Sequence, residues 1–405
     1  MSKRILFVDD EPMLLMGLQR SLRSMRQEWE MAFVNGGKEA LEAIDKQPFD
    51  IVVTDMRMPG MDGAQLLEQV KKRSPQTLRM ILSGQSDRET ILRAVNPTHQ
   101  YLSKPCEGEE LKARLLRAFA LRDLLENNEL KDLVSRLHCL PSLPTLYFEL
   151  TEELSCEEPS LARVGRLISA DMAMTAKILQ LVNSAFFGLR CQVSKASFGV
   201  ELLGLDNVRA LVLSTHIFSK FETDLFQDAD LQYMWEHSLA AGSYAKRIAM
   251  LEHGSQRVVD ECFTAALLHD AGKLIMASVS PEKYKGVLQL VRAGDKGLVE
   301  AEREVMGCTH AEVGAYLFGL WGLPSALIEA VAWHHKPMES LHAKFSPLAA
   351  VHVASVYHEQ KASSSIKDTT PINRDFLSQI GCSDRERQWR ATLEGEMSGK
   401  EPVHE

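Results

Sequence analysis

Short apolar runs alternate with segments of helical periodicity in the N-terminal third of the chain. The runs at residues 4–8, 51–54 and 79–82 are mostly apolar, and each ends at polar residues. Weaker strand patterns lie at residues 30–34 and 100–103. Apolar runs separated by helical segments are typical of parallel strands whose sheet is covered by helices. The pattern predicts one doubly wound α/β domain with five parallel strands and five helices.

A segment without glycine or proline follows, from residue 109 to about residue 137. Its spacing predicts one long helix, or two in tandem, with an apolar stripe on one side. Two interpretations stay open: the last helix of the α/β domain plus a connector, or a coiled coil that joins two copies of the chain. Asn127 and Asn128 interrupt the stripe, whose members are Leu111, Leu115, Phe119, Leu121, Leu124, Leu125, Leu130, Leu133, Val134 and Leu137.

The sequence from Pro144 to about residue 360 is helical in pattern nearly throughout, with glycine and proline at the turns. This pattern predicts an all-α second domain. A polar loop and a short helix at residues 371–380 should follow, and the last ten or so residues should fray. We therefore divide the chain into an α/β domain, a helical connector, an all-α domain and a C-terminal tail, at residues 1–122, 123–137, 138–385 and 386–405.

The composition is that of an ordinary globular protein, with 45% apolar and 25% charged residues. No apolar stretch approaches 18 residues, so we expect neither a membrane segment nor a targeting sequence. The seven cysteines are scattered, odd in number and without CxxC spacing, which argues against a disulfide framework and against a thiolate zinc site. These features predict a cytoplasmic protein.

The formal net charge of −9 comes mainly from the second half of the chain. Residues 126–405 contain 27 Lys and Arg against 37 Asp and Glu, whereas the first 125 residues are nearly balanced. A nucleic-acid-binding domain usually carries a basic surface. The acidic excess therefore argues against DNA binding by the second domain.

Polar residues follow four of the predicted strands. Asp9 and Asp10 come after the first strand, Asp55 after the third, Ser83 after the fourth and Lys104 after the fifth. The carboxyl ends of parallel strands meet at one edge of the sheet, so these side chains should converge. Three carboxylates repel one another there unless a hard cation such as Mg²⁺ lies between them. A carboxylate can then attack a phosphoryl group whose charge the cation and the lysine neutralise.

Residues 3–122 resemble the receiver domain of two-component response regulators. The resemblance implies that Asp55 is the phosphoacceptor and that a sensor histidine kinase is the donor. It also implies that Mg²⁺ is bound by Asp10, Asp55 and the backbone carbonyl of Arg57, with Asp9 acting through water.

Two further positions match this family. Ser83 and Tyr101 correspond to its switch pair, a hydroxyl that follows the phosphoryl group and an aromatic ring that turns inward. The segment at residues 58–63 (Met-Pro-Gly-Met-Asp-Gly) supplies a tight turn after the acceptor. We therefore expect a working phosphorylation site that biases the domain between two conformations.

Histidines and one aspartate form a spaced series in the second domain. Imidazole and carboxylate groups on neighbouring helices can converge as ligands for one or two transition metals. A lysine one turn later can contact a phosphate group. The ligand candidates are His237, His269, Asp270, His310, His334 and His335, and the phosphate contact is Lys273.

Residues 138–385 resemble the HDOD family, a branch of the HD-domain superfamily, through motifs at residues 140–144, 171–188, 202–212 and 267–273. HD phosphohydrolases complete their metal shell with an aspartate on a late helix, where this chain has Ser355. The residues after His335 also lack the Gly-Tyr-Pro element of cyclic-di-GMP phosphodiesterases. Hydrolysis of that dinucleotide is therefore not expected.

Two functions for the second domain stay open. In the first, phosphorylation at Asp55 controls a non-catalytic HDOD output that binds an unidentified downstream protein or nucleotide. In the second, the receiver controls a metal-dependent HD-type phosphohydrolase that acts on a nucleotide or phosphoester. The apolar stripe before residue 138 further predicts a homodimer through the connector helix.

Overall fold

The computed structural model describes most of the chain, and every structural statement below refers to this part. The described residues are 3–83, 98–104, 108–124, 131, 134–135, 137, 141–142, 144–156, 158–183, 192–209, 212, 219–220, 228–340, 344–361 and 370–395.

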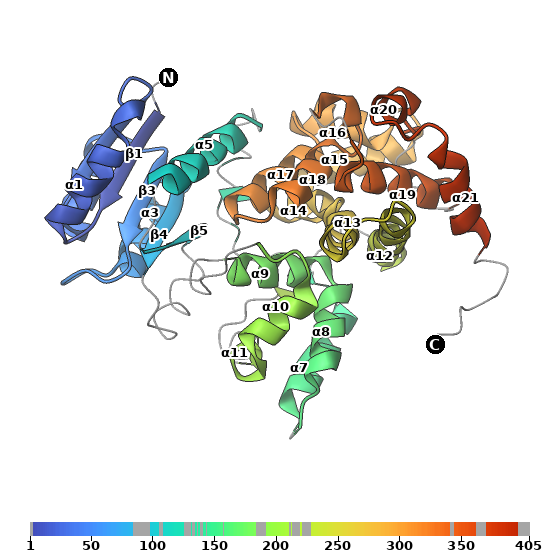
Figure 1. Cartoon of the computed structure of the whole chain (residues 1–405), viewed down its shortest axis with the longest axis horizontal. Helices are drawn as coiled ribbons and strands as arrows, with labels where there is room; N and C mark the ends of the chain where they lie inside the picture. The colour runs from blue at the N-terminus through green and yellow to red at the C-terminus, as the bar shows by residue number, and fades with distance from the viewer. Residues whose placement is uncertain are drawn as a thin grey trace.

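A five-stranded parallel sheet forms the N-terminal domain (Figure 1). Its spatial order is β2 (Trp29–Val34), β1 (Lys3–Val8), β3 (Ile51–Asp55), β4 (Leu78–Ser83) and β5 (Gln100–Ser103). The order reverses between β1 and β3, which makes their carboxyl ends the expected place for a site. The predicted α/β class and the five parallel strands are confirmed.

Four described helices belong to this sheet: α1 (Pro12–Ser21), α2 (Gly37–Lys46), α3 (Gly63–Arg73) and α5 (Gly108–Leu124). Successive residues of a strand point to opposite faces. Ile5 and Phe7 accordingly join one buried cluster, while Leu6 and Val8 join another. Burial on both faces explains why this strand reads as a continuous apolar run. The fifth predicted helix falls outside the described residues.

The second domain is helical, as predicted. In chain order its helices are α7 (Pro144–Ser155), α8 (Leu161–Ala170), α9 (Met172–Val182), α10 (Ala196–Leu203), α11 (Leu205–Arg209), α12 (Asp228–Leu251), α13 (Gln256–Leu268), α14 (Ala271–Val279), α15 (Pro281–Arg292), α16 (Leu298–Met306), α17 (His310–Leu320), α18 (Ser325–Trp333), α19 (Pro347–Lys361), α20 (Arg374–Gln379) and α21 (Arg385–Gly395). The sequence pattern did not predict β6 (Pro141–Ser142) and β7 (Ser219–Lys220), which pair in parallel.

The prediction of a C-terminal tail from residue 386 is wrong for residues 386–395, because these residues lie in helix α21. Trp389 is fully buried, and its indole N–H donates at 3.0 Å to Oε1 of Glu252, the residue after α12. Leu393 is also buried. This mainly polar helix is therefore held to the domain by one apolar face. The few apolar residues of that face did not predict a packed helix from the sequence alone.

Among the described residues, the stretch Gln256–Val279 is long and apolar enough, by length and composition alone, to cross a membrane. This stretch comprises α13 and α14 and is 83% buried inside the protein. Helices that are apolar all round are also found in the cores of large domains. The packing of this stretch explains its composition without a membrane.

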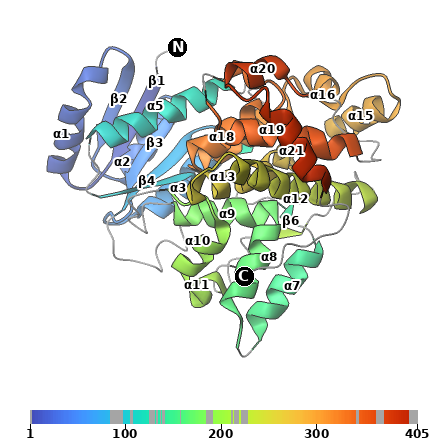
Figure 2. The ribbon, with the colours of Figure 1, turned by 45° about the vertical axis from the view of Figure 1, so that its right-hand side comes forward.

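The two domains are in contact (Figures 1 and 2). Helix α5 of the sheet domain packs against α17 of the helical domain. Among the described residues of the predicted connector, Val134 and Ser135 are buried. Val134 belongs to the same apolar cluster as Leu115 of α5 and Tyr316 of α17. This member of the predicted stripe is therefore used within the chain, while dimerisation stays a prediction.

Candidate functional site

The first site lies at the carboxyl ends of β1, β3 and β5. Val8 pairs with Thr54, so Asp9 and Asp55 lie at the adjacent ends of neighbouring strands. Asp9 and Asp55 are 1% and 7% exposed. Lys104, just after β5, places its Nζ 2.7 Å from Asp9 Oδ2 and also forms an ion pair with Asp55 Oδ1. Three of the residues predicted to converge do so.

Backbone donors orient the two carboxylates. Asp55 Oδ2 accepts from the N–H of Arg57 at 2.6 Å, and Asp9 Oδ1 accepts from the N–H of Glu11 at 2.9 Å. Burial alone lowers the pKa of Lys104, but the hydrogen bonds to Asp55 and Asp9 outweigh it and raise that pKa, so the ammonium stays charged. Asp10 is exposed beside them.

The switch pair is placed only in part. Ser83 ends β4 and Tyr101 lies in β5, so both are next to the site in the sheet. The side chains of Ser83 and Tyr101 lie outside the described part of the chain. Their predicted roles stay predictions.

Helix α3 begins directly behind the acceptor. Asp62 caps it by accepting from the N–H of Gln65 at 2.7 Å, and the Gln65 side chain accepts from the N–H of Asp62 at 3.1 Å. A Cβ added at Gly63 would overlap the backbone oxygen of Asp55. Glycine at this position therefore allows the helix to start against the strand end.

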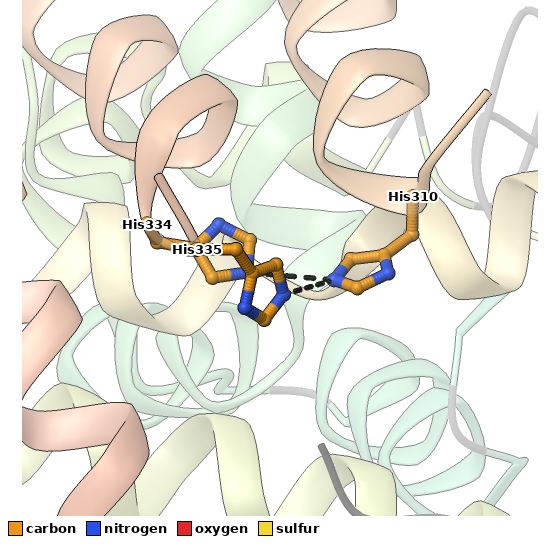
Figure 3. Close-up of side chains that lie close together, drawn as sticks. All are labelled: His310, His334 and His335. Carbon is orange, nitrogen blue, oxygen red and sulfur yellow. Dashed lines mark hydrogen bonds between the residues drawn. The ribbon is translucent and has the colours of Figure 1, made fainter. Parts of the chain in front are cut away.

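The second site is a cluster of histidines around Asp270, at the meeting point of five helix ends or faces. Helix α12 supplies His237, the junction of α13 and α14 supplies His269 and Asp270, α17 begins with His310, and α18 is followed by His334 and His335. Figure 3 shows that the rings of His334 and His335 point toward His310. The Nε2 atom of His310 lies 2.9 Å from Nε2 of His335 and 3.4 Å from Nε2 of His334.

These residues form two candidate metal triads. In each triad, one ligand atom per residue lies within 4.8 Å of the others: His237, His269 and Asp270 in the first, and His310, His334 and His335 in the second. Asp270 Oδ1 is 3.5 Å from His269 Nε2 and 3.3 Å from His310 Nε2. The carboxylate thus lies between the triads and can contact a cation in either.

Backbone carbonyls outside the cluster orient two of the imidazoles. The Nδ1 atoms of His269 and His334 lie 2.6 and 2.8 Å from the carbonyl oxygens of Ala266 and Val331. A carbonyl oxygen only accepts, so each Nδ1 carries the hydrogen and each neutral ring directs its Nε2 lone pair inward. Lone pairs that face one another at 3 to 4 Å require a proton or a cation between them. This donor set suits Zn²⁺ or a similar transition metal.

Burial favours the neutral, metal-binding form of most of these rings. It lowers the pKa of His237, His334 and His335 well below the ordinary value. His310 differs: burial also lowers its pKa, but Glu302 and Asp270 outweigh this and raise it to about 9. Burial raises the pKa of Asp270, yet the nearby His269 and Lys273 hold it well below its usual range.

Glu302 was missed by the sequence analysis. Its carboxylate lies 2.7 Å from His310 Nδ1 and accepts from the His310 backbone N–H at 2.9 Å, and it is fully buried. A carboxylate on the outer nitrogen of a histidine is a common support of metal ligands. Glu302 lies in α16 and His310 begins α17, so the turn between the two helices, not a spacing along one helix, brings them together.

Three other residues lie in or beside the cluster. The ammonium of Lys273 is buried and forms an ion pair with Asp270 Oδ2 at 2.6 Å, and its phosphate contact stays a prediction. His358, one helical turn after Ser355, places its Nδ1 2.8 Å from His237 Nδ1. His352 turns away, and its Nδ1 donates to the backbone oxygen of His334 at 2.7 Å.

Replacing Gly272 by alanine is expected to lower the free energy of unfolding by about 1–3 kcal/mol, because an added Cβ would overlap the backbone oxygen of His310 and separate α14 from α17. Alanine at Gly286 in α15, where the Cβ would meet Val305 at 3.7 Å, is the matched control and should raise stability by up to about 1 kcal/mol. Urea unfolding followed by circular dichroism measures both. Equal effects of the two variants would contradict the tight contact.

Comparison with known proteins agrees with this architecture. The response regulator receiver domain model matches residues 5–116, and the HDOD domain model matches residues 140–337. The fold and acidic site of the N-terminal domain are those of a receiver domain, a class that in general binds Mg²⁺ at its phosphorylation site. The chain belongs to the two-component response regulators that join a receiver domain to an HDOD domain.

Two curated relatives and two solved structures illustrate the similarity. An uncharacterised protein of Treponema pallidum (strain Nichols) is 26% identical over 212 residues, 50% of this chain and 39% of that protein. The transcriptional regulatory protein ZraR of Escherichia coli K12 is 30% identical over 195 residues, 45% of this chain and 44% of that protein. The chain therefore spans less than half the length of these curated relatives.

The MmoQ response regulator from Methylococcus capsulatus str. Bath aligns with a TM-score of 0.49 and 24% identity, over 63% of this chain and 97% of that chain. An HDOD domain protein of unknown function from Geobacter sulfurreducens aligns with a TM-score of 0.38 and 22% identity, over 71% of this chain and 96% of that chain.

Proposed function

We propose that Asp55 is the phosphoacceptor and that its phosphorylation controls the HDOD domain. The observation that carries the proposal is the pairing of the buried Asp55 and Asp9 carboxylates with the Lys104 ammonium. When Mg²⁺ is bound, it shields the acceptor and the incoming phosphoryl group from mutual repulsion. The oxygen donors of Asp9, Asp10, Asp55 and the Arg57 carbonyl suit this hard cation.

Lys104 neutralises negative charge in this arrangement. Its ammonium already reaches both Asp9 and Asp55, so it is held where phosphoryl oxygens would bring further negative charge. The backbone N–H of Arg57 holds Asp55 Oδ2, which leaves Oδ1 as the attacking oxygen once Lys104 moves toward the phosphoryl group. Incubation of the full chain with acetyl phosphate and Mg²⁺ tests the proposal by whether position 55 is phosphorylated.

The docking surface for the kinase includes α1, which starts three residues after Asp9. Met13 and Met16 on this helix are 72% and 53% exposed. Replacing Met16 by glutamate is expected to slow phosphotransfer from a histidine kinase roughly tenfold, because a central apolar contact of this size commonly contributes that much.

Two controls define this prediction. Phosphorylation of Met16→Glu by acetyl phosphate should be unchanged, because the small donor needs no docking surface. Met250→Glu, at a methionine of 58% exposure on α12, should leave both rates unchanged. A wild-type rate of transfer from the kinase to Met16→Glu would remove α1 from the docking surface.

For the HDOD domain we propose a non-catalytic output that presents a surface to a downstream protein or nucleotide. The side chains of His237, His269, Asp270, His310 and His334 are 0–3% exposed. A catalytic metal centre needs an open coordination position for water and substrate. Ligands buried to this extent are more consistent with a structural metal.

The sharing of Asp270 between two triads favours a second candidate, a metal-dependent phosphohydrolase. Metal analysis of the purified protein, combined with activity tests on a panel of phosphoesters and nucleotides, separates the two. Bound transition metal without turnover supports the non-catalytic output. Turnover that is lost in His269→Ala would overturn it.

The remaining assignments are a cytoplasmic location, no DNA binding, and a homodimer through the connector helix. Sedimentation with and without beryllofluoride tests the last of these. A monomer in both states would show that phosphorylation does not control the output through self-association.

A further inference from the structure

Buried hydrogen bonds join the receiver to the C-terminal end of α17. The Gln100 side chain, at the start of β5, donates from Nε2 to the backbone oxygen of Gly319 at 2.9 Å. Gly319 lies in the last turn of α17, and its backbone oxygen also accepts from the N–H of Gly322 at 3.0 Å, so Gln100 is a further donor to this oxygen. Gln100 is next to Tyr101 of the switch pair, so the same strand carries the switch position and the contact to α17.

A second contact runs through the connector. Arg79, at the start of β4, donates from Nη2 to the backbone oxygen of Ser135 at 3.0 Å, and His99 Nε2 lies 3.2 Å from the same oxygen. Ser135 Oγ in turn lies 3.3 Å from the hydroxyl of Tyr316 on α17. Burial lowers the pKa of Arg79 to about 10, so the guanidinium remains charged at neutral pH. Breaking this contact would leave a buried cation short of an acceptor.

The other end of α17 lies in the histidine cluster. His310 is the first residue of the helix, and Glu302 holds both its backbone N–H and its Nδ1. Gly272 and Gly314 let α14 and α17 approach so closely that a Cβ at Gly272 would overlap His310. A helix of 11 residues is a stiff rod of about 16 Å. With so little free space along it, a displacement at Gly319 cannot be absorbed locally and must move His310 as well.

We propose that α17 is the element through which the receiver and the histidine cluster influence each other. The receiver holds its C-terminal end through Gln100 and through Ser135, and the cluster holds its N-terminal end through His310. This inference rests on the proposed phosphorylation of Asp55. The change in β5 that follows phosphorylation alters the Gln100 contact, and α17 carries that change to His310.

Hydrogen exchange of the full chain, with and without beryllofluoride and Mg²⁺, tests the coupling. In the wild type, beryllofluoride should change the exchange of α17 amides at least about fivefold, the lower end of ordinary coupling between sites. In Gln100→Leu the response of α17 should fall below about twofold, while the response around Asp55 is retained. A purely structural role of Gln100 would change exchange equally with and without beryllofluoride.

Two further variants sharpen this experiment. Gln289→Leu makes the same change on the exposed face of α15 and should respond as the wild type does. Tyr316→Phe removes the hydroxyl contact to Ser135 but keeps the buried ring, and should weaken the response of α17. A full α17 response in Gln100→Leu, or none in the wild type while the Asp55 loop responds, would overturn the coupling alone. No response at the Asp55 loop either would overturn the phosphorylation proposal with it.

Discussion

Asp55→Asn is expected to abolish phosphorylation by acetyl phosphate, with no acyl phosphate detected on the chain by mass spectrometry or phosphate-affinity electrophoresis. The amide oxygen is a poor nucleophile, and the carboxylate that attacks the phosphoryl group is gone. The variant should nonetheless fold, because its amide oxygen can still accept from the N–H of Arg57 and Lys104 retains Asp9.

Asp45→Asn is the matched control for this experiment. Asp45 is an exposed aspartate of α2 whose ion pair with Arg73 spans 3.0 Å, and an exposed pair of this kind contributes at most about 1 kcal/mol. Phosphorylation of Asp45→Asn should match the wild type. If a well-folded Asp55→Asn chain were labelled as fully as the wild type, the acceptor would be another residue and the proposed control of the output would lose its basis.

Asp270→Asn is expected to have the largest effect in the HDOD domain. Asp270 accepts from Lys273 at 2.6 Å, and both side chains are buried. Loss of the negative charge leaves the ammonium without a counter-ion, which costs about 3–5 kcal/mol in comparable buried pairs. Loss of a supporting residue alone lowers metal affinity about 10–100-fold, so removing Asp270, a candidate direct ligand, is expected to lower it by at least as much.

Two variants separate the stability effect from the metal effect. Asp270→Asn combined with Lys273→Met removes both charges and should recover much of the stability without recovering the metal. Asp295→Asn changes an exposed aspartate and should alter neither the stability nor the metal content. Thermal unfolding and elemental analysis of dialysed protein measure the two quantities. Full metal content in the stable double variant would show that Asp270 is not a ligand.

The receiver site was predictable because its chemistry depends on strand order rather than on helix packing. Asp9 and Asp55 each follow an apolar run, and parallel strands bring their carboxyl ends to one edge whatever else the chain does. The observed strands agree with the predicted ones to within a residue or so at each end. Lys104 was predictable for the same reason.

The histidine cluster was predictable only as a set of residue types. Spacing along the chain identified the histidines, but it did not predict that Glu302 orients His310 or that His358 rather than His352 reaches His237. Those outcomes depend on which face of each helix meets its neighbours, and helix crossing is set by packing over many residues. The buried ion pair of Lys273 escaped prediction for the same reason.

By itself, the sequence determined two domains, their fold classes and the residues that form the acidic site, because apolar periodicity and strand-end chemistry are local properties of the chain. Only the tertiary structure decided how α21 closes the helical domain, which groups orient the histidines, and that α17 joins the receiver to them. These features come from contacts between residues tens to hundreds of positions apart, such as Gln100 with Gly319. The energy of such a contact depends on the burial and geometry of both partners, which the sequence of one segment does not specify.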